Sequence, residues 1–248
     1  MKYKILRIII LAGMSCALSG CITGGAAFGL GAGSLHETVM TEKKKNAPPP
    51  VYGPPQIIYR IDDNRYFTLE NYTRCENGQT FYNNKAKGIH FPISPGSGYL
   101  FKGRLFWLSS RDDYLAFPFT RDTNKAVCAV SEKGCKNLIT VTVDGGKTRR
   151  AIDYGYYTKT PTSDTKDYDM VVTDDGFYMI EYSLPDRAPY AAHADKWTFK
   201  PSKETIYSHG HIYPGVTGPE YQPQLDFDVS HVVQSKMKCD RRLEPVQP

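Results

Sequence analysis

The 248-residue chain lacks an apolar run long enough to cross a bilayer as a helix. The run near its start, Ile8–Leu18, has 11 residues, whereas a spanning helix needs about 20. No helical period extends beyond two turns, which argues against an α-helical domain. Paired Cys-x-x-Cys spacings, Gly-x-Ser-x-Gly and His-Glu-x-x-His are also missing. The motif signals of a zinc ribbon, a serine-hydrolase elbow and a zinc peptidase are therefore absent.

The chain also has little excess charge. It contains 31 basic and 26 acidic residues. Three of the basic residues, Lys2, Lys4 and Arg7, and none of the acidic ones fall within the first twenty positions, so the remainder carries 28 − 26 = +2. Binding to phosphate backbones depends on clustered positive charge. We therefore expect no nucleic-acid partner.

The first twenty-one residues form a pattern of their own. A basic head, a short apolar run and small residues are typical of a secretory signal. The closing Leu18-Ser19-Gly20-Cys21 resembles the lipobox of bacterial lipoproteins. The resemblance implies a signal peptide over residues 1–20 and acylation of Cys21, with palmitate among the attached chains. In that family a non-acidic residue after the lipidated cysteine, here Ile22, implies an outer-membrane location facing the periplasm.

Composition then divides the rest of the chain into three parts. Residues 21–55 are rich in Gly and Ala, then in Lys and Pro, which predicts an extended, lipid-anchored tether. Residues 56–240 are long enough for one well-packed domain. Residues 241–248 are expected to be a loose tail.

Four cysteines remain if Cys21 is acylated: Cys75, Cys128, Cys135 and Cys239. An even count in the oxidising periplasm favours two disulfides. Cys128–Cys135 is the favoured pair because Ser131–Gly134 between them has the composition of a turn. Cys75–Cys239 would then tie the end of the chain to the body. A zinc site is the alternative, but the spacing disfavours it.

Short strand-like runs separated by turn signals dominate the domain. They predict an all-β fold, either an antiparallel β-sandwich or a partial propeller-like array, stapled by disulfides. Hairpins are expected at Lys102-Gly103 and at Asp174-Asp175-Gly176. The predicted strands are Gln56–Ile61, Arg65–Leu69, Tyr99–Phe101, Arg104–Leu108, Leu138–Val143, Met170–Val172, Phe177–Tyr182, Trp197–Phe199 and Phe227–Val229.

The segment Thr142–Thr148 resembles the Asp-box turn of sialidase-type propellers, although Arg149 stands where an aromatic residue is expected. In such a turn the aspartate, here Asp144, braces its own hairpin. The segment therefore indicates a structural hairpin and not catalysis, and a plain Asp-Gly hairpin is the alternative.

Candidate chemical groups are few. His209 and His211 offer two imidazoles to a metal, but a third ligand is not evident, so we expect no metal and no cofactor. Neighbouring strand residues point to opposite faces, and the acidic pairs occur in turn-like contexts, so they suit general acid–base work poorly. These pairs are Asp62-Asp63, Asp112-Asp113 and Asp174-Asp175. We expect no catalytic residue and no enzymatic activity.

Several segments, in order, resemble the immunity lipoproteins that neutralise phospholipase effectors of type VI secretion. They are Tyr59–Phe67, Tyr72–Cys75, Gly98–Arg104, the Cys128/Cys135 pair and Asp144-Gly145-Gly146, within Gln56–Tyr154. The resemblance implies a membrane-anchored inhibitor whose partner is a lipase effector, which it blocks by occlusion. The interface residues cannot be assigned from the sequence. The main alternative is a general envelope lipoprotein that binds glycan or cell-wall material through its aromatic residues.

Overall fold

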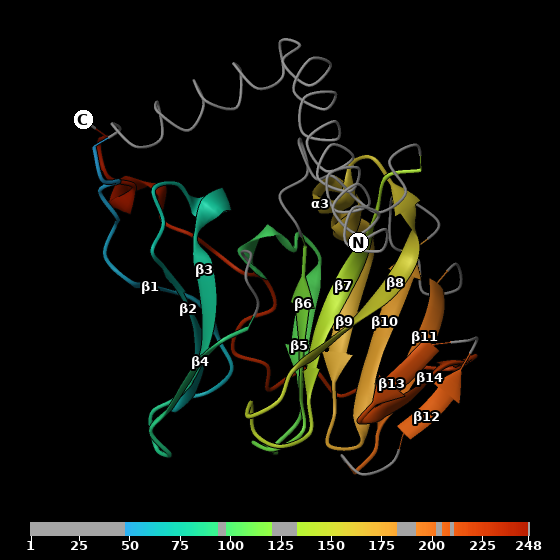
Figure 1. Cartoon of the computed structure of the whole chain (residues 1–248). Helices are drawn as coiled ribbons and strands as arrows, with labels where there is room; N and C mark the ends of the chain where they lie inside the picture. Colours follow the sequence, from blue (N-terminus) through green and yellow to red (C-terminus); the bar gives the residue numbers. More distant parts are fainter. Residues whose placement is uncertain are drawn as a thin grey trace, which may run out of the picture. The chain divides into compact units, whose positions relative to one another are not determined.

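Short β-strands are the main regular secondary structure of the protein, described here by a computed structural model (Figure 1). It describes residues 48–93, 98–120, 133–182, 192–201, 205–208 and 211–247. Residues 50–247 form one compact unit. Cys21, the predicted signal peptide and most of the predicted tether lie outside the described residues, so these assignments stay predictions. None of the helices in the described ranges has the length and apolar character needed to span a membrane.

The first sheet is a four-stranded antiparallel meander in the order β1-β2-β3-β4. Its strands are β1 (Gln56–Arg60), β2 (Arg65–Glu70), β3 (Gln79–Asn84) and β4 (Ile89–Pro92). Asp62 closes the β1–β2 turn because its Oδ1 accepts hydrogen bonds from the backbone N–H groups of Asn64 and Arg65, both at 2.8 Å. Such side-chain bonds stabilise a tight turn.

The second sheet has the order β14-β11-β10-β9-β5. Its strands are β5 (Arg104–Trp107), β9 (Tyr168–Val172), β10 (Gly176–Tyr182), β11 (Ala192–Phe199) and β14 (Val216–Tyr221). The predicted hairpin at Asp174-Asp175-Gly176 is confirmed as the β9–β10 connection.

The predicted hairpin at Lys102-Gly103 is wrong. Gly98–Leu100 forms a 3-10 helix, η2, and β5 instead pairs in parallel with β9. A long-range ion pair accompanies this pairing, because Arg104 binds the fully buried carboxylate of Asp169 on β9. A buried charge requires such a partner, and this pair aligns the two strands.

The third sheet, in the order β6-β7-β8, is also antiparallel. It contains β6 (Leu115–Phe119), β7 (Cys135–Thr142) and β8 (Arg150–Thr158), and a separate hairpin joins β12 (Thr205–Ser208) to β13 (His211–Pro214). Within the described residues the only α-helix is α3 (Pro161–Asp164), which continues into the 3-10 helix η3 (Thr165–Asp167).

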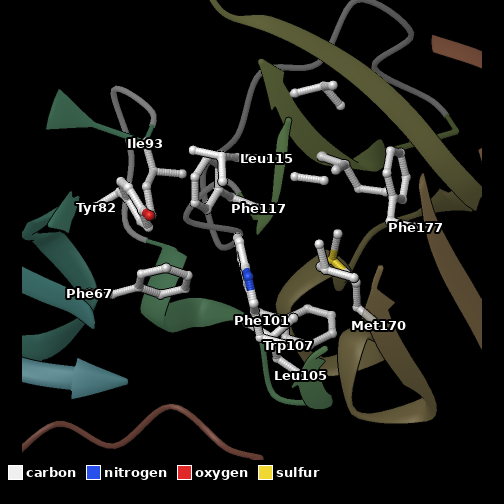
Figure 2. Close-up of a cluster of buried hydrophobic side chains, with 14 of the residues drawn as sticks. Phe67, Tyr82, Ile93, Phe101, Leu105, Trp107, Leu115, Phe117, Met170 and Phe177 are labelled. Atoms are coloured by element: carbon white, nitrogen blue, oxygen red, sulfur yellow. The ribbon is translucent and has the colours of Figure 1, made fainter. Parts of the chain in front are cut away.

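One aromatic cluster joins the three larger sheets. Phe117 on β6 has its ring centroid 5.6 Å from that of Phe67, 5.5 Å from Tyr82 and 5.5 Å from Trp107. These neighbours come from the first and second sheets, and Figure 2 shows them converging on Phe117. The predicted β fold is therefore confirmed, with mostly antiparallel sheets and one parallel pair, β5 with β9, and no closed barrel forms among the described strands.

The Asp-box-like segment braces the β7–β8 hairpin. Asp144 accepts hydrogen bonds from the backbone N–H of Thr148 at 2.9 Å and from the hydroxyls of Thr148 and Thr142. Burial acts to raise the pKa of Asp144, but these hydrogen bonds outweigh it and lower the pKa. The segment has the structural role that the sequence predicts.

After β14, residues 222–239 form an irregular segment without strands, which we call the strap. The predicted strand Phe227–Val229 is therefore wrong. Phe227 packs against Tyr178, with ring centroids 4.9 Å apart, on the face of the second sheet that points away from the main core. Farther along, the carbonyl of Ser235 accepts a bond from Leu105 N, and Lys238 N donates to the carbonyl of Ile58, both at 2.8 Å. The strap thus satisfies the outer edges of β5 and β1, which otherwise expose unpaired backbone groups.

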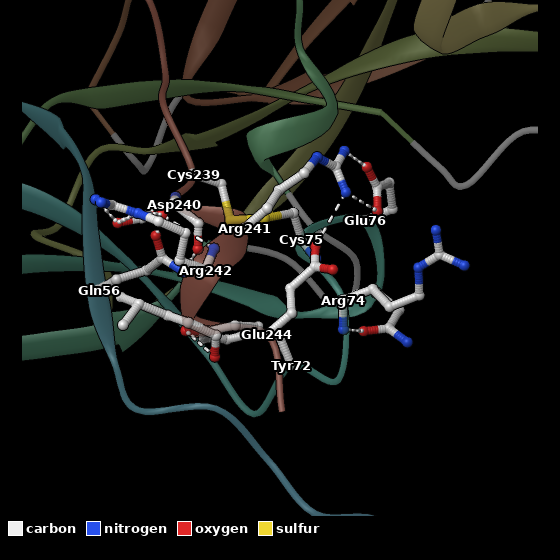
Figure 3. The surroundings of a disulfide bond; sticks show 12 residues. Gln56, Tyr72, Arg74, Cys75, Glu76, Cys239, Asp240, Arg241, Arg242 and Glu244 are labelled. Atoms are coloured by element: carbon white, nitrogen blue, oxygen red, sulfur yellow. Dashed lines mark hydrogen bonds and ion pairs between the residues drawn. A yellow bond between two sulfur atoms is a disulfide. The ribbon is translucent and has the colours of Figure 1, made fainter. Parts of the chain in front are cut away.

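A disulfide between Cys75 and Cys239 ends the strap, and this is the pairing that the sequence favoured (Figure 3). Cys75 lies at the start of the 3-10 helix η1 (Cys75–Asn77). Its backbone N–H donates to the carboxylate of Glu244 at 3.0 Å. Cys128 lies outside the described residues, so the pair Cys128–Cys135 stays a prediction.

The end of the chain is also held by charge. Arg241, in the 3-10 helix η5 (Arg241–Leu243), forms ion pairs with Glu76 and Glu244 (Figure 3). Gln247 donates to the carbonyl of Val51 at 2.9 Å. The sequence predicts a loose tail over residues 241–248, whereas these contacts hold residues 241–247 against the domain.

Candidate partner-binding site

Strand β8 leaves its regular register with β7 near its end. Asn137 pairs with Tyr154, whereas the next pair joins Cys135 to Thr158. Between these pairs lie one residue of β7, Lys136, and three residues of β8, Gly155, Tyr156 and Tyr157. The two extra residues form a β-bulge, a device that re-aims side chains at the edge of a sheet.

Gly155 makes this bulge possible. Its φ is +69°, a conformation that residues with a side chain rarely adopt. A Cβ atom at this position would lie 2.7 Å from the hydroxyl oxygen of Tyr168. Glycine therefore supplies both the backbone geometry and the space that lets the bulge rest on the Tyr168 side chain.

The bulge presents two adjacent tyrosines to solvent. Tyr156 is 79% exposed and Tyr157 is 46% exposed. Beneath them, Tyr154 and Tyr168 are buried with their rings in an edge-to-face arrangement, 5.2 Å between centroids. Isolated exposed apolar groups are common on protein surfaces. An adjacent aromatic pair on a buried aromatic base has instead the character of a protein-binding anchor.

Lys136 steadies the bulge from the β7 side. Its ammonium nitrogen lies 2.5 Å from a carboxylate oxygen of Asp153 and 5.3 Å from the ring centroid of Tyr157. A cation over an aromatic face is attracted to the ring. Lys136 thus links the Tyr157 ring to the carboxylate of Asp153 on the same strand.

A cavity of about 270 Å³ lies beside the bulge, between β7, β8, the α3–η3 turn and β10. Tyr156 and Tyr157 form part of its wall. Three acidic side chains line it, each from a different element: Asp164 from α3, Asp167 from η3 and Glu181 from β10. The described lining contains no Lys or Arg, so the cavity has a concentrated negative charge.

The polar groups of the cavity are unevenly satisfied. Burial, followed by the neighbouring carboxylate of Glu181, raises the pKa of Tyr168 well above its ordinary value. Asn137 is 4% exposed, and its Nδ2 donates to the carbonyl of Pro161 at 3.1 Å. Its Oδ1 is buried without a hydrogen-bond partner among the described residues. An acceptor of this kind is costly unless it is satisfied.

The acidic pairs considered in the sequence have structural roles. Asp62 closes the β1–β2 turn, as described above. Asp112 accepts a hydrogen bond from Asn84 at 2.8 Å and forms an ion pair with Lys87 at 2.7 Å. Asp174 accepts hydrogen bonds from the Ser109 hydroxyl and the Ser110 backbone, at 2.9 and 2.8 Å. These contacts agree with the interpretation that the pairs brace turns.

The described part of the chain also contains no cluster of three or more side chains suited to hold a metal ion. His209 lies outside the described residues. His211 belongs to β13, but its side chain is not described.

Sequence reasoning did not find the bulge. The available signal was Gly155, a lone glycine inside the strand-like stretch Arg150–Thr158. Such a glycine often marks a bulge or a close backbone approach. The two tyrosines that follow it would then have been candidates for outward-facing anchors.

The fold and this surface suit a protein that acts by binding another protein, and comparison with known families identifies the class as type VI secretion immunity proteins. A model described as "T6SS Tli3 immunity protein" matches residues 51–181, more than half of the chain. The chain therefore belongs to the Tli3 family. Every residue that lines the cavity falls within the matched segment. A comparison with curated proteins finds no match.

Proposed function

We propose that this immunity protein is anchored to the outer membrane, faces the periplasm, and binds and blocks a phospholipase effector of type VI secretion. The observation that carries the proposal is the tyrosine pair, which projects from a bulge inside the segment matched by the Tli3 family model. We name the surface formed by Tyr156, Tyr157 and the adjacent acidic cavity the bulge surface.

Inhibition by occupation of the effector requires no catalytic group. A standard interface buries roughly 1,600 Å² in total, and a few aromatic anchors near its centre dominate its energy. The bulge surface offers two such anchors on a firmly packed base. An effector covered there cannot admit a lipid substrate or move a lid over its active site. The chain therefore acts as a stoichiometric inhibitor, without turnover and without a cofactor.

The membrane anchor is supported by the sequence alone. Cys21 closes a segment that resembles a lipobox, and more than one acyl chain gives stable anchoring. A flexible tether of about 34 residues spans roughly 30 Å. That reach would hold the domain close to the lipids that a phospholipase attacks, so that inhibitor and effector meet at the same surface.

Replacing both bulge tyrosines tests the site. The double variant Tyr156→Ala/Tyr157→Ala is expected to weaken effector binding by about 100-fold or more, because central aromatic anchors each contribute about 2 kcal/mol or more. Calorimetry with the full chain and the purified effector measures the loss. Thermal unfolding should change little, since both side chains project into solvent.

The matched control is Tyr52→Ala. Tyr52 is 53% exposed, but it precedes β1 in the first sheet and does not line the cavity. The control should bind the effector as the wild type does. Equal affinity of the double variant and the wild type would place the interface elsewhere on the molecule.

A further inference from the structure

We propose that the acidic cavity beside the bulge receives an arginine side chain from the partner protein. This inference rests on the proposed function for the identity of the partner and adds the chemistry by which that partner is recognised. The cavity itself is a feature of this chain alone, so its ligand preference can be tested without the effector.

The lining of the cavity is acidic. Asp164, Asp167 and Glu181 approach one cavity from three separate elements, and none of the described residues lining it is basic. Tyr168 lines the cavity together with Glu181 but brings no positive charge. A cationic guest would neutralise this concentration of negative charge and form charge-assisted hydrogen bonds, which are about twice as strong as neutral ones.

The side chain of Asn137 contains a hydrogen-bond acceptor without a partner among the described residues. The Asn137 Oδ1 is buried without a hydrogen-bond partner among the described residues, and Asn137 lines the cavity. Buried acceptors of this kind are normally satisfied. A guest that carries an N–H or O–H donor would satisfy this acceptor, whereas an aliphatic side chain or a carboxylate would leave it unpaired.

Shape selects arginine among the cationic side chains. A guanidinium is planar, carries five N–H donors in a fixed fork and has no acceptor. It can bind a carboxylate with two parallel hydrogen bonds, donate to an amide oxygen and stack on an aromatic face. The cavity offers all three partners: the acidic groups, Asn137, and the ring of Tyr156.

Size is consistent with a single side chain. The volume of about 270 Å³ lies just below the roughly 300–1,000 Å³ of typical small-molecule pockets. The described residues also contain no cluster suited to a metal ion, so a bare divalent cation is a poor candidate.

The direct test uses arginine amide as the probe and the full chain as the receptor. Citrulline amide is the control ligand because it replaces the charged guanidinium with a neutral urea of similar shape. NMR titration should show saturable, millimolar binding of arginine amide, with shifts in the side-chain amide signal of Asn137. Citrulline amide should bind at least tenfold more weakly.

The matched variants remove charge at the cavity or away from it. Asp167→Asn/Glu181→Gln should weaken arginine amide binding at least tenfold. Asp63→Asn/Asp226→Asn removes the same charge from two exposed positions that do not line the cavity, and it should leave binding unchanged. Tyr156→Ala alters only an exposed ring and should weaken binding several-fold, so it provides the test if the acidic double variant does not fold.

Three results would overturn the inference: no saturable binding of arginine amide, equal binding by the cavity variants, or equally tight binding of lysine amide. Binding of the effector itself is measured as a separate test. If the effector is bound and inhibited but Asp167→Asn/Glu181→Gln binds it as tightly as the wild type, the inference fails and the proposed function stands. Cavity-dependent arginine amide binding without any effector partner would confirm the ligand preference of the cavity and count against both the proposed function and an effector arginine as its natural guest.

Discussion

Replacing Cys75 and Cys239 with alanine is expected to lower the free energy of unfolding by about 4–5 kcal/mol. The bond joins residues 164 positions apart, and in the chain-entropy model the stabilisation increases with loop length, reaching about 4.7 kcal/mol for a loop of 100 residues. Without the bond, the strap that satisfies the edges of β1 and β5 is held by non-covalent contacts alone: hydrogen bonds, ion pairs and the packing of Phe227 on Tyr178.

Urea denaturation of the full chain, with and without reductant, measures this effect. Reductant should destabilise the wild type strongly, and the double variant by only the contribution of any other disulfide. A loss below about 1 kcal/mol would contradict the prediction. It would mean that the contacts of Arg241 and Glu244 fix the end of the chain by themselves.

Phe117→Ala is expected to cost about 3–5 kcal/mol, the usual range for removing a buried aromatic side chain. The Phe117 side chain is fully buried and packs on rings from the first and second sheets. Its removal therefore opens a cavity where three sheets meet. Thermal unfolding followed by circular dichroism should show one cooperative transition at a lower temperature.

The control is Phe106→Ala. Phe106 is only partly buried and lies on the other face of the second sheet, away from this cluster, so its loss should cost much less. Two separate transitions in Phe117→Ala, or equal costs for the two variants, would show that the sheets do not share one core as Figure 2 indicates.

Local sequence patterns predicted much of the fold. Strand-like sequence runs located seven of the fourteen described strands, and Asp174-Asp175-Gly176 correctly predicted the β9–β10 hairpin. The predicted hairpin at Lys102-Gly103 was wrong because β5 pairs instead with β9. Asp169 on β9 binds Arg104 on β5, although the two residues are 65 positions apart. The predicted strand at Phe227 was wrong because its side chain covers an apolar face of the second sheet, whereas its backbone pairs with no strand.

The candidate site was less accessible to sequence reasoning. Gly155 was a readable signal for a bulge, but nothing local shows that the bulge lies on Tyr168. The acidic cavity depends on the register between β7 and β8 and on the turn that leads into β9. Asp164, Asp167 and Glu181 become a site only through these long-range pairings.

The most direct test of the proposed function is an inhibition assay. The full chain, exported so that its cysteines oxidise, is used to capture its partner from native lysate, and the purified partner is assayed on phospholipid vesicles. We predict phospholipase activity that one equivalent of the wild-type chain abolishes and that Tyr156→Ala/Tyr157→Ala leaves largely intact. A partner without phospholipase activity, or one inhibited equally by the wild type and the variant, would contradict the proposal.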